Sequence, residues 1–174
     1  PFVTSSSASA GGACIGSGVG PTRIDRVLGV AKAYCTRVGE GPFPTEELGA
    51  VGERLREAGG EYGATTGRPR RCGWLDMVAL RYAVRVNGLG GIALTKLDVL
   101  TGLDHIKVCT GYECGGKLHD ILPPRLPAAE NLGLHYETLP GWSEDLSGCR
   151  KIEELPVAAR HYVRFIEEKC GVPV

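Results

Sequence analysis

The sequence predicts an α/β fold, in which helices pack on strands in layers. Two segments, 74–88 and 156–171, place apolar residues at the spacing of amphipathic helices, and Gly88 and Gly171 are suited to end them. Residues 91–95 form a short apolar run of the kind that becomes a buried strand. Because helices and strands follow one another along the chain, we expect layers of both around one core.

The first half of the chain contains two further predicted elements. A stripe of apolar residues predicts that 22–37 begins as a helix and continues as an extended segment. Glycine and proline mark 39–46 as a loop. Thr45 is expected to cap a helix that runs to about Ala58, with two glutamates in its first turn. A long glycine-rich loop then leads to the 74–88 helix.

Two more strands are expected in the second half. Apolar and polar residues alternate within 102–114, which predicts a strand. A shorter strand is expected within 134–142. The proline-rich stretch between them, 115–133, is expected to be irregular.

Composition excludes some classes of partner. Lysine plus arginine and aspartate plus glutamate number 20 each, so no overall field attracts nucleic acid or an anionic membrane. No apolar run approaches the roughly 18 residues of a transmembrane helix, and no signal peptide opens the chain. The chain begins at Pro1 rather than methionine and stops on the apolar Val174. We therefore expect residues 1–174 to form a single, incomplete domain of a longer protein.

The seven cysteines form no CxxC pair. Cys109, Cys114 and His119 are spaced five residues apart, which invites comparison with a zinc site. A structural zinc site needs four ligands and usually a closer first pair. Scattered reduced thiols in a cytoplasmic protein are the favoured interpretation.

The string "ALTKLD" places Lys96 and Asp98 where the 91–95 strand ends. Ligands of open α/β sheets bind beyond the carboxyl ends of strands. An aspartate there can accept two hydrogen bonds from a guanine edge, and a lysine stem can lie against the base. Thr95 stands where the N-K-x-D motif of GTP-binding proteins has asparagine, so an exposed Lys–Asp pair on a turn is the simpler interpretation of these residues alone.

A second group, "ATTGRPRR" (Ala64–Arg71), lies on the glycine-rich loop before the 74–88 helix, which we call the arginine loop. It combines two threonine hydroxyls with Arg68, Arg70 and Arg71. The planar guanidinium binds carboxylates and phosphates through paired hydrogen bonds. An anion-binding loop is favoured over a solvated basic turn. A third segment, "VTSSSASAGG" at 3–12, is either a phosphate cradle or a low-complexity linker.

Several strings, taken in order, resemble the adenylosuccinate synthetase family: "GEGPFPTE", "EYGATTGRPRRCGWLD", "ALRYAVRVNG" and "ALTKLDVL". The resemblance covers nearly the whole chain, as roughly the C-terminal half of the enzyme. It implies part of a P-loop-NTPase-like, mostly parallel central sheet flanked by helices. It also implies a GTP-dependent ligase that joins IMP to L-aspartate, yielding adenylosuccinate, GDP and phosphate.

The resemblance assigns roles to three groups of residues. The loop that closes on aspartate would comprise Ala64, Thr65, Thr66, Gly67, Arg68, Pro69 and Arg70. IMP would be contacted by Thr4 near its phosphate and by Arg68 at its ribose. GTP would be contacted by Arg70 and by a guanine pocket of Lys96, Leu97 and Asp98.

Other parts of the family's site have no counterpart in this sequence. The phosphate loop, the catalytic aspartate and histidine, the magnesium ligands and a second guanine-binding turn are absent. None of the four histidines lies in a matching motif. The resemblance therefore implies no catalytic residue within the chain, an isolated piece without activity, and a parent enzyme that is a cytoplasmic homodimer using Mg²⁺.

Two alternatives come from other functional classes. A stand-alone guanine-nucleotide switch requires a GxxxxGK[ST] phosphate loop before the TKLD strand, which this sequence lacks. A nucleic-acid-binding module around the arginine loop predicts a basic face with aromatic platforms. The net charge of zero and the aromatic content of 6% disfavour such a module.

Overall fold

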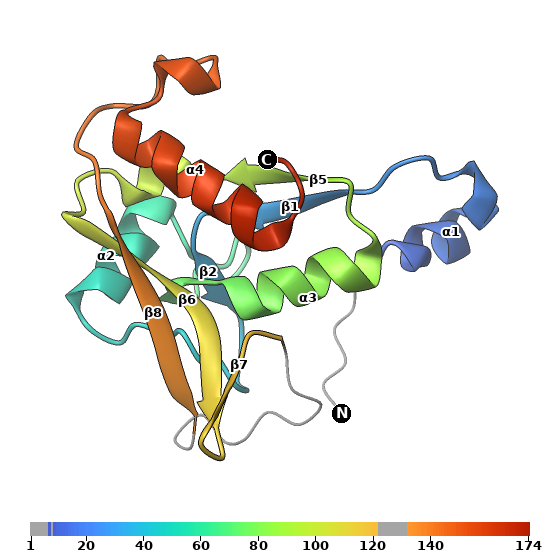
Figure 1. Cartoon of the computed structure of the whole chain (residues 1–174), viewed down its shortest axis with the longest axis horizontal. Coiled ribbons are helices and arrows are strands. Elements are labelled where there is room, and N and C mark those ends of the chain that lie inside the picture. Colours follow the sequence, from blue (N-terminus) through green and yellow to red (C-terminus); the bar gives the residue numbers. More distant parts are fainter. Residues whose placement is uncertain (1–6, 8, 122–131) are drawn as a thin grey trace.

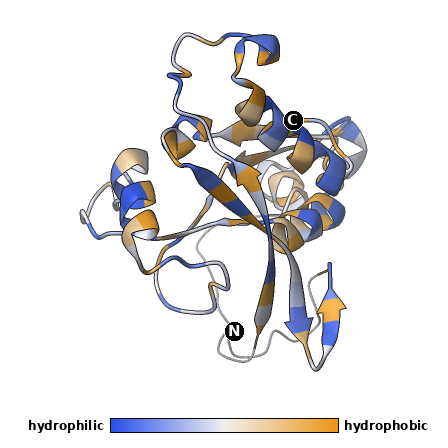
Figure 2. Cartoon of the chain, turned by 60° about the vertical axis from the view of Figure 1, so that its left-hand side comes forward, coloured by the Kyte–Doolittle hydropathy of each residue, from blue (hydrophilic) through white to orange (hydrophobic). Residues whose placement is uncertain are grey.

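The computed structural model describes residue 7, residues 9–121 and residues 132–174 of the chain. Helices and strands alternate, which confirms the α/β class (Figure 1). The helices are α1 (Gly11–Ser17), α2 (Ala50–Gly59), α3 (Met77–Asn87) and α4 (Val157–Cys170). Helices α2, α3 and α4 carry both hydrophobic and charged residues, as amphipathic helices do, and Figure 2 shows helices of this mixed colouring.

The strands of the described residues belong to three small sheets. Strand β1 (Leu28–Lys32) runs parallel to β5 (Gly91–Thr95), with Lys32 opposite Thr95 at their carboxyl ends. Strands β2 (Cys35–Arg37) and β3 (Arg71–Gly73) form an antiparallel pair. The third sheet joins β4 (Leu75–Asp76), β6 (His105–Cys114), β7 (Lys117–His119) and β8 (Gly133–Pro140). Within this third sheet, β4 runs parallel to β6, whereas β7 and β8 run antiparallel to it. Of the five strand pairs in the described chain, three are therefore antiparallel.

The ends of α3 and α4 follow the capping rules that predicted them. The Asp76 carboxylate accepts hydrogen bonds from the backbone N–H groups of Val78 (3.0 Å) and Ala79 (3.1 Å), so α3 begins after Asp76. Gly88 ends α3 with a φ of 57°, and Gly171 ends α4 with a φ of 71°. The 156–171 helix and the 91–95 strand are thereby confirmed. The 74–88 helix is confirmed from Met77 onward, but its predicted start is wrong, because Leu75 and Asp76 pair with β6 as strand β4.

The core lies between α4 and the strand ends. Tyr162 of α4 is fully buried, packs its ring at 6.0 Å from that of Trp142, and donates its hydroxyl to the carbonyl of Ala33. The Ala33 N–H in turn donates to the Thr95 carbonyl (2.8 Å). These hydrogen bonds connect the carboxyl ends of β1 and β5 to the buried side of α4.

Two predictions for the first half are wrong. Residues 22–37 form no α-helix, but a 3₁₀ turn at Pro21–Arg23 followed by β1 and β2. A short apolar run fits either period, and the hydrogen-bond ladder with β5 decides in favour of a strand. Thr45 is not a helix cap: it is buried, its carbonyl accepts from the Trp74 N–H (3.0 Å), and α2 starts only after Gly49.

The second half of the chain agrees more closely with the predicted elements. Strands β6 and β8 confirm the two predicted within 102–114 and 134–142. The stretch 115–133 is not wholly irregular, because β7 pairs back onto β6 through the turn at Gly115 and Gly116. Residues 122–131 of that stretch lie outside the described residues.

Strand β1 presents apolar side chains to solvent. Leu28 is 59% exposed and Val30 is 78% exposed. Within the described residues β1 pairs only with β5, so its other edge carries no neighbouring strand. Helix α1 lies at one end of the molecule, next to the end of α3, where the Ala10 N–H donates to the Asn87 side chain (2.7 Å) (Figure 1).

Asp76 supports a test of the fold. Its carboxylate caps α3 and also accepts the hydroxyl of the buried Tyr112. Replacing Asp76 by alanine removes the cap and leaves that hydroxyl unpaired, so the free energy of unfolding should fall by about 2–4 kcal/mol. Chemical denaturation measures this change. The control Glu137→Ala removes only the half-exposed ion pair with Lys169 and should cost less than about 1 kcal/mol; equal stability of the Asp76 variant and wild type would contradict the assignment.

Candidate functional site

The carboxyl ends of β1 and β5 bring together residues that are distant in the sequence. Lys96 follows β5 with a φ of 62°, the one positive value of a non-glycine residue in the described chain. This left-handed turn leads into the 3₁₀ helix Leu97–Leu100, which contains Asp98. The Lys96 ammonium donates to the carbonyl of Gly59 at the end of α2. The Lys–Asp segment is therefore tied to the start of the arginine loop rather than being an isolated surface pair.

Glu61 lies at the base of the arginine loop and is 1% exposed. Its Oε1 accepts from Lys32 Nζ at 2.6 Å and from the Tyr34 hydroxyl at 2.7 Å. Its Oε2 accepts from Arg70 Nη1 at 2.8 Å. One buried carboxylate therefore joins the end of β1 to the end of the arginine loop.

Backbone hydrogen bonds close the same loop. The Arg70 N–H donates to the Glu61 carbonyl (2.9 Å), and the Gly63 N–H donates to the Arg68 carbonyl (2.8 Å). Arg56 of α2 donates its Nε–H to the Arg70 carbonyl (3.0 Å). The tip, residues 64–69, is exposed. The predicted aspartate loop thus has a fixed base and a solvent-facing tip that carries its hydroxyls.

Among Glu61, Lys32 and Arg70 the side-chain charges sum to one positive charge, and Arg56 adds a further cation at the loop base. Burial raises the pKa of the Glu61 carboxyl, but the hydrogen bonds from its three partners outweigh burial and hold that pKa below its usual range. Glu61 is therefore ionised at neutral pH, beside the two cations of Lys32 and Arg70. The Arg70 Nε–H is buried and has no hydrogen-bond partner among the described residues. The base is suited to a carboxylate or phosphate group.

Arg68 lines a hollow of about 320 Å³ on the neighbouring surface. Arg37 and Arg71 also line it, together with the segment Gly39–Gly41 and Pro69. Arg71 is paired with Glu46, whereas the Arg37 side chain donates to the Glu40 carbonyl (3.1 Å). The backbone carbonyls of Gly39, Glu40 and Gly41 already accept from Arg37 and Arg71, so the three guanidinium groups are the features of this hollow that favour a polar, anionic ligand. Sequence reasoning missed Arg37, whose only local signal is its place just before "GEGP".

Leu97 and Asp98 line a second hollow, of about 410 Å³. Asp145, Leu146, Ser147, Cys149 and Leu155 complete its wall. Hydrogen bonds from Ser147 hold the pKa of Asp145 below its usual range. The hollow combines apolar walls with carboxylate acceptors, which suits a flat base that offers N–H donors.

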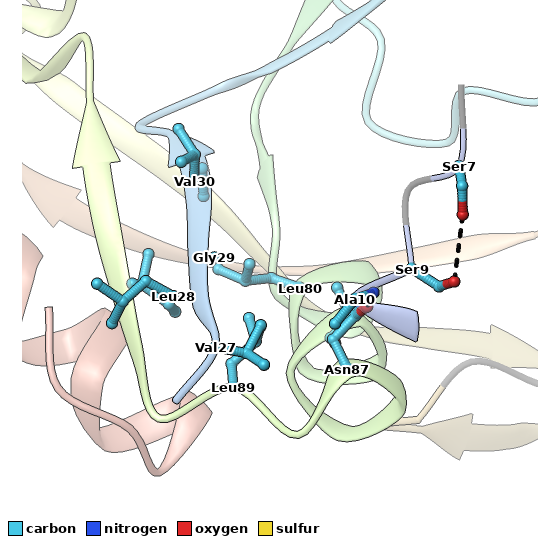
Figure 3. A pocket seen from close by; sticks show the side chains of 13 residues that line it. Ser7, Ser9, Ala10, Val27, Leu28, Gly29, Val30, Leu80, Asn87 and Leu89 are labelled. Atoms are coloured by element: carbon cyan, nitrogen blue, oxygen red, sulfur yellow. Dashed lines mark hydrogen bonds between the residues drawn. The ribbon is translucent and has the colours of Figure 1, made fainter. Parts of the chain in front are cut away.

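A third hollow, of about 280 Å³, lies between β1, α3 and the segment that contains Ser7 and Ser9 (Figure 3). Leu80, Leu89 and Ile92 make much of its wall apolar. The N–H groups of Ala10, Gly12 and Ala13 are already bonded, to Asn87 and to the preceding turn. They are not free to bind a phosphate, so the cradle predicted at 3–12 gains no support from these residues. Thr4 lies outside the described residues.

The described residues contain no group of three or more His, Cys, Asp or Glu side chains that could hold a metal ion. Cys109 is buried and directs its thiol to the Gly111 carbonyl, and Cys114 pairs with Lys117 across the β6–β7 ladder. The spacing of Cys109, Cys114 and His119 therefore does not produce a zinc site. In the same part of the chain, no helix is long and apolar enough to cross a membrane.

Comparison with known proteins gives one consistent family. The family model described as adenylosuccinate synthetase matches residues 1–174. The adenylosuccinate synthetases of Pelobacter propionicus and Sorangium cellulosum are 62% and 63% identical to the whole chain, which covers 40% of each. The structure of the fully ligated adenylosuccinate synthetase from Plasmodium falciparum matches with a TM-score of 0.92 and 43% identity, over all of this chain and 42% of that one.

The chain thus spans about 40% of the length of these relatives. The matches extend through the arginine loop, the Lys–Asp turn and both terminal regions, because every one of them covers the full chain. The chain belongs to the adenylosuccinate synthetase family.

Proposed function

We propose that the full-length protein containing this chain is a GTP-dependent ligase that joins IMP and L-aspartate to form adenylosuccinate, GDP and phosphate. One observation carries the proposal: the arginine loop and the Lys–Asp turn, which are separate in the sequence, meet at the carboxyl ends of β1 and β5. Ligands of α/β sheets bind at such an edge. Membership of the family supports the same chemistry.

The hollows support a division of roles. Leu97 and Asp98 bind guanine in the 410 Å³ hollow, and Lys96, which directly precedes them, contributes its stem to the same pocket. Arg68 reaches the IMP ribose from the 320 Å³ hollow. Residues 64–70 bind aspartate, and Arg70, at the base of the loop, contacts both aspartate and GTP. Thr4 binds IMP near its phosphate.

The reaction proceeds in two steps. GTP transfers its terminal phosphoryl group to the 6-oxygen of IMP, and the aspartate amine then displaces that phosphate from the ring. Aspartate carries two carboxylates, so cations must attract it and fix its amine in line with the ring carbon. The cations at the loop base and the hydroxyls of the exposed tip provide this.

Other groups of the site lie outside the chain. We propose that the catalytic aspartate and histidine and the ligands of Mg²⁺ belong to the rest of the protein, because the family motifs that would carry them have no counterpart in this sequence. We further propose that residues 1–174 are one incomplete domain, in which β1 and β5 belong to a P-loop-NTPase-like, mostly parallel central sheet. The complete protein is a cytoplasmic homodimer.

Assay of the full-length protein tests the proposed function. It should consume IMP, L-aspartate and GTP and release adenylosuccinate, GDP and phosphate in equal amounts. Omission of any one substrate should stop the reaction. The absorbance change at the purine ring and a phosphate assay measure this stoichiometry; GTP hydrolysis without adenylosuccinate would reject ligase activity.

Asp98→Asn tests the guanine pocket. The asparagine side chain loses one acceptor for the guanine N2–H₂ and gains a donor that matches the 2-oxygen of xanthine. The ratio of kcat/KM for GTP to that for xanthosine triphosphate should therefore fall by roughly 10- to 100-fold, the scale of hydrogen bonds to charged groups. Asp104→Asn, an exposed substitution outside this hollow, is the control. An unchanged preference would show that Asp98 does not contact the base.

Arg70→Leu tests the aspartate loop. The substitution removes a charged hydrogen-bond donor, which should raise the KM for aspartate by about 1.5–3 kcal/mol, or roughly 10- to 150-fold. Steady-state kinetics with saturating IMP and GTP measure the effect. Arg164→Leu, on the exposed face of α4, provides a matched loss of one arginine and should leave this KM unchanged. Equal aspartate KM values in both variants would contradict the assignment of Arg70.

A further inference from the structure

We propose that Glu61 is a positioning residue of this site, which holds the Arg70 guanidinium in the orientation that binds aspartate. The inference rests on the proposed function, because it concerns how the substrate-binding arginine is placed. Neither "EYGATTGRPRR" nor any spacing in the sequence indicates such a role for Glu61. The role follows from what the Glu61 carboxylate contacts.

Glu61 differs from the other ion-paired carboxylates of the described chain in burial and in number of partners. It is 1% exposed, whereas Glu46, Glu113 and Glu137 are 19%, 53% and 44% exposed and each pairs with a single side chain. A buried charge requires several hydrogen bonds to be tolerated. Glu61 has three, from Lys32, Tyr34 and Arg70.

The partners of Glu61 are only partly covered. The side chains of Lys32 and Arg70 are 28% and 31% exposed, so both cations reach solvent while their carboxylate does not. Glu61 occupies one donor of Arg70, Nη1, from the protein side. The nearby Nε–H has no partner within the described residues. This arrangement anchors the guanidinium at one corner, while 31% of the Arg70 side chain stays exposed.

The loop backbone does not depend on the Glu61 side chain. The hydrogen bonds from Arg70 N–H to the Glu61 carbonyl and from Arg56 to the Arg70 carbonyl involve main-chain acceptors. A glutamine at position 61 preserves them and preserves the side-chain volume. It removes the negative charge and replaces one carboxylate oxygen by an N–H₂ group. That group is a donor, and it faces the donors of Lys32 or Arg70. Glu61→Gln therefore removes the ionic component of the hold on the guanidinium without opening the loop.

The experiment compares four forms of the full-length protein: wild type, Glu61→Gln, Arg70→Leu and the double variant. Glu61→Gln should raise the KM for aspartate by about 10-fold, while kcat and the KM for IMP change by less than about threefold. In the Arg70→Leu background, the same substitution should have no further effect on the aspartate KM, since the arginine that it positions is gone. Additive effects, or an unchanged KM in Glu61→Gln, would overturn the proposal.

A control separates positioning from general loss of stability. Asp76→Asn also neutralises a buried, multiply bonded carboxylate, but one that caps α3 and contacts no residue of the arginine loop. It should lower the thermal midpoint and leave the aspartate KM unchanged. A rise in KM that equals that of Glu61→Gln would show that instability alone causes both, and would overturn the proposal.

A measurement without turnover keeps the inference distinct from the proposed function. In protein labelled with ¹⁵N-arginine, the Arg70 Nε–H signal, assigned by its loss in Arg70→Leu, should exchange slowly with water in wild type. Exchange should be at least about 10-fold faster in Glu61→Gln and unchanged in Asp76→Asn. Slow exchange that persists in Glu61→Gln would overturn the positioning role even in an active ligase. Protein with the expected exchange but no ligase activity would instead overturn the proposed function.

Discussion

The candidate site depends on one buried carboxylate. An ionised side chain that is 1% exposed is stable only when its desolvation is offset by charged and hydrogen-bonded neighbours. Glu61 draws these neighbours from the end of β1, from Tyr34 and from the end of the arginine loop. Because all three must meet at one point, the loop cannot shift against the strand without leaving a buried charge unpaired. The Lys96 ammonium adds β5 to the same unit through the Gly59 carbonyl.

The core behind the site keeps this unit in place. The Tyr162 hydroxyl donates to the Ala33 carbonyl, and the Ala33 N–H donates to the Thr95 carbonyl. Helix α4 therefore fixes the ends of β1 and β5, where Lys32 and Lys96 lie. A binding site built on strand ends is held more precisely than one built on loops alone. The exposed tip, residues 64–69, is then the part of the site that remains free to adjust to a ligand.

Sequence reasoning succeeded where the signals are local. Helices α3 and α4 were predictable because the apolar spacing and a left-handed glycine at the end agree in both, and Pro156 marks the start of α4. The start of α3 was placed too early, because the cap at Asp76 follows from its pairing in β4. Sequence reasoning failed for 22–37 and for Thr45, because pairing with β5 and the carbonyl contact to Trp74 are tertiary. The nearness of the arginine loop and the Lys–Asp turn came from family resemblance, and Glu61 was missed because its partner Lys32 lies 29 positions away.

The sign of the charge at position 61 determines what the site can bind. With glutamate, Lys32 and Arg70 share one negative charge, which reduces their mutual repulsion and still leaves a net attraction for an anion. A neutral residue would leave two cations facing each other in a poorly solvated place, where repulsion turns them toward solvent and away from a common ligand. A second carboxylate nearby would cancel the attraction. One buried acid between two half-exposed bases is thus the arrangement that both fixes the cations and keeps them available to a dicarboxylate.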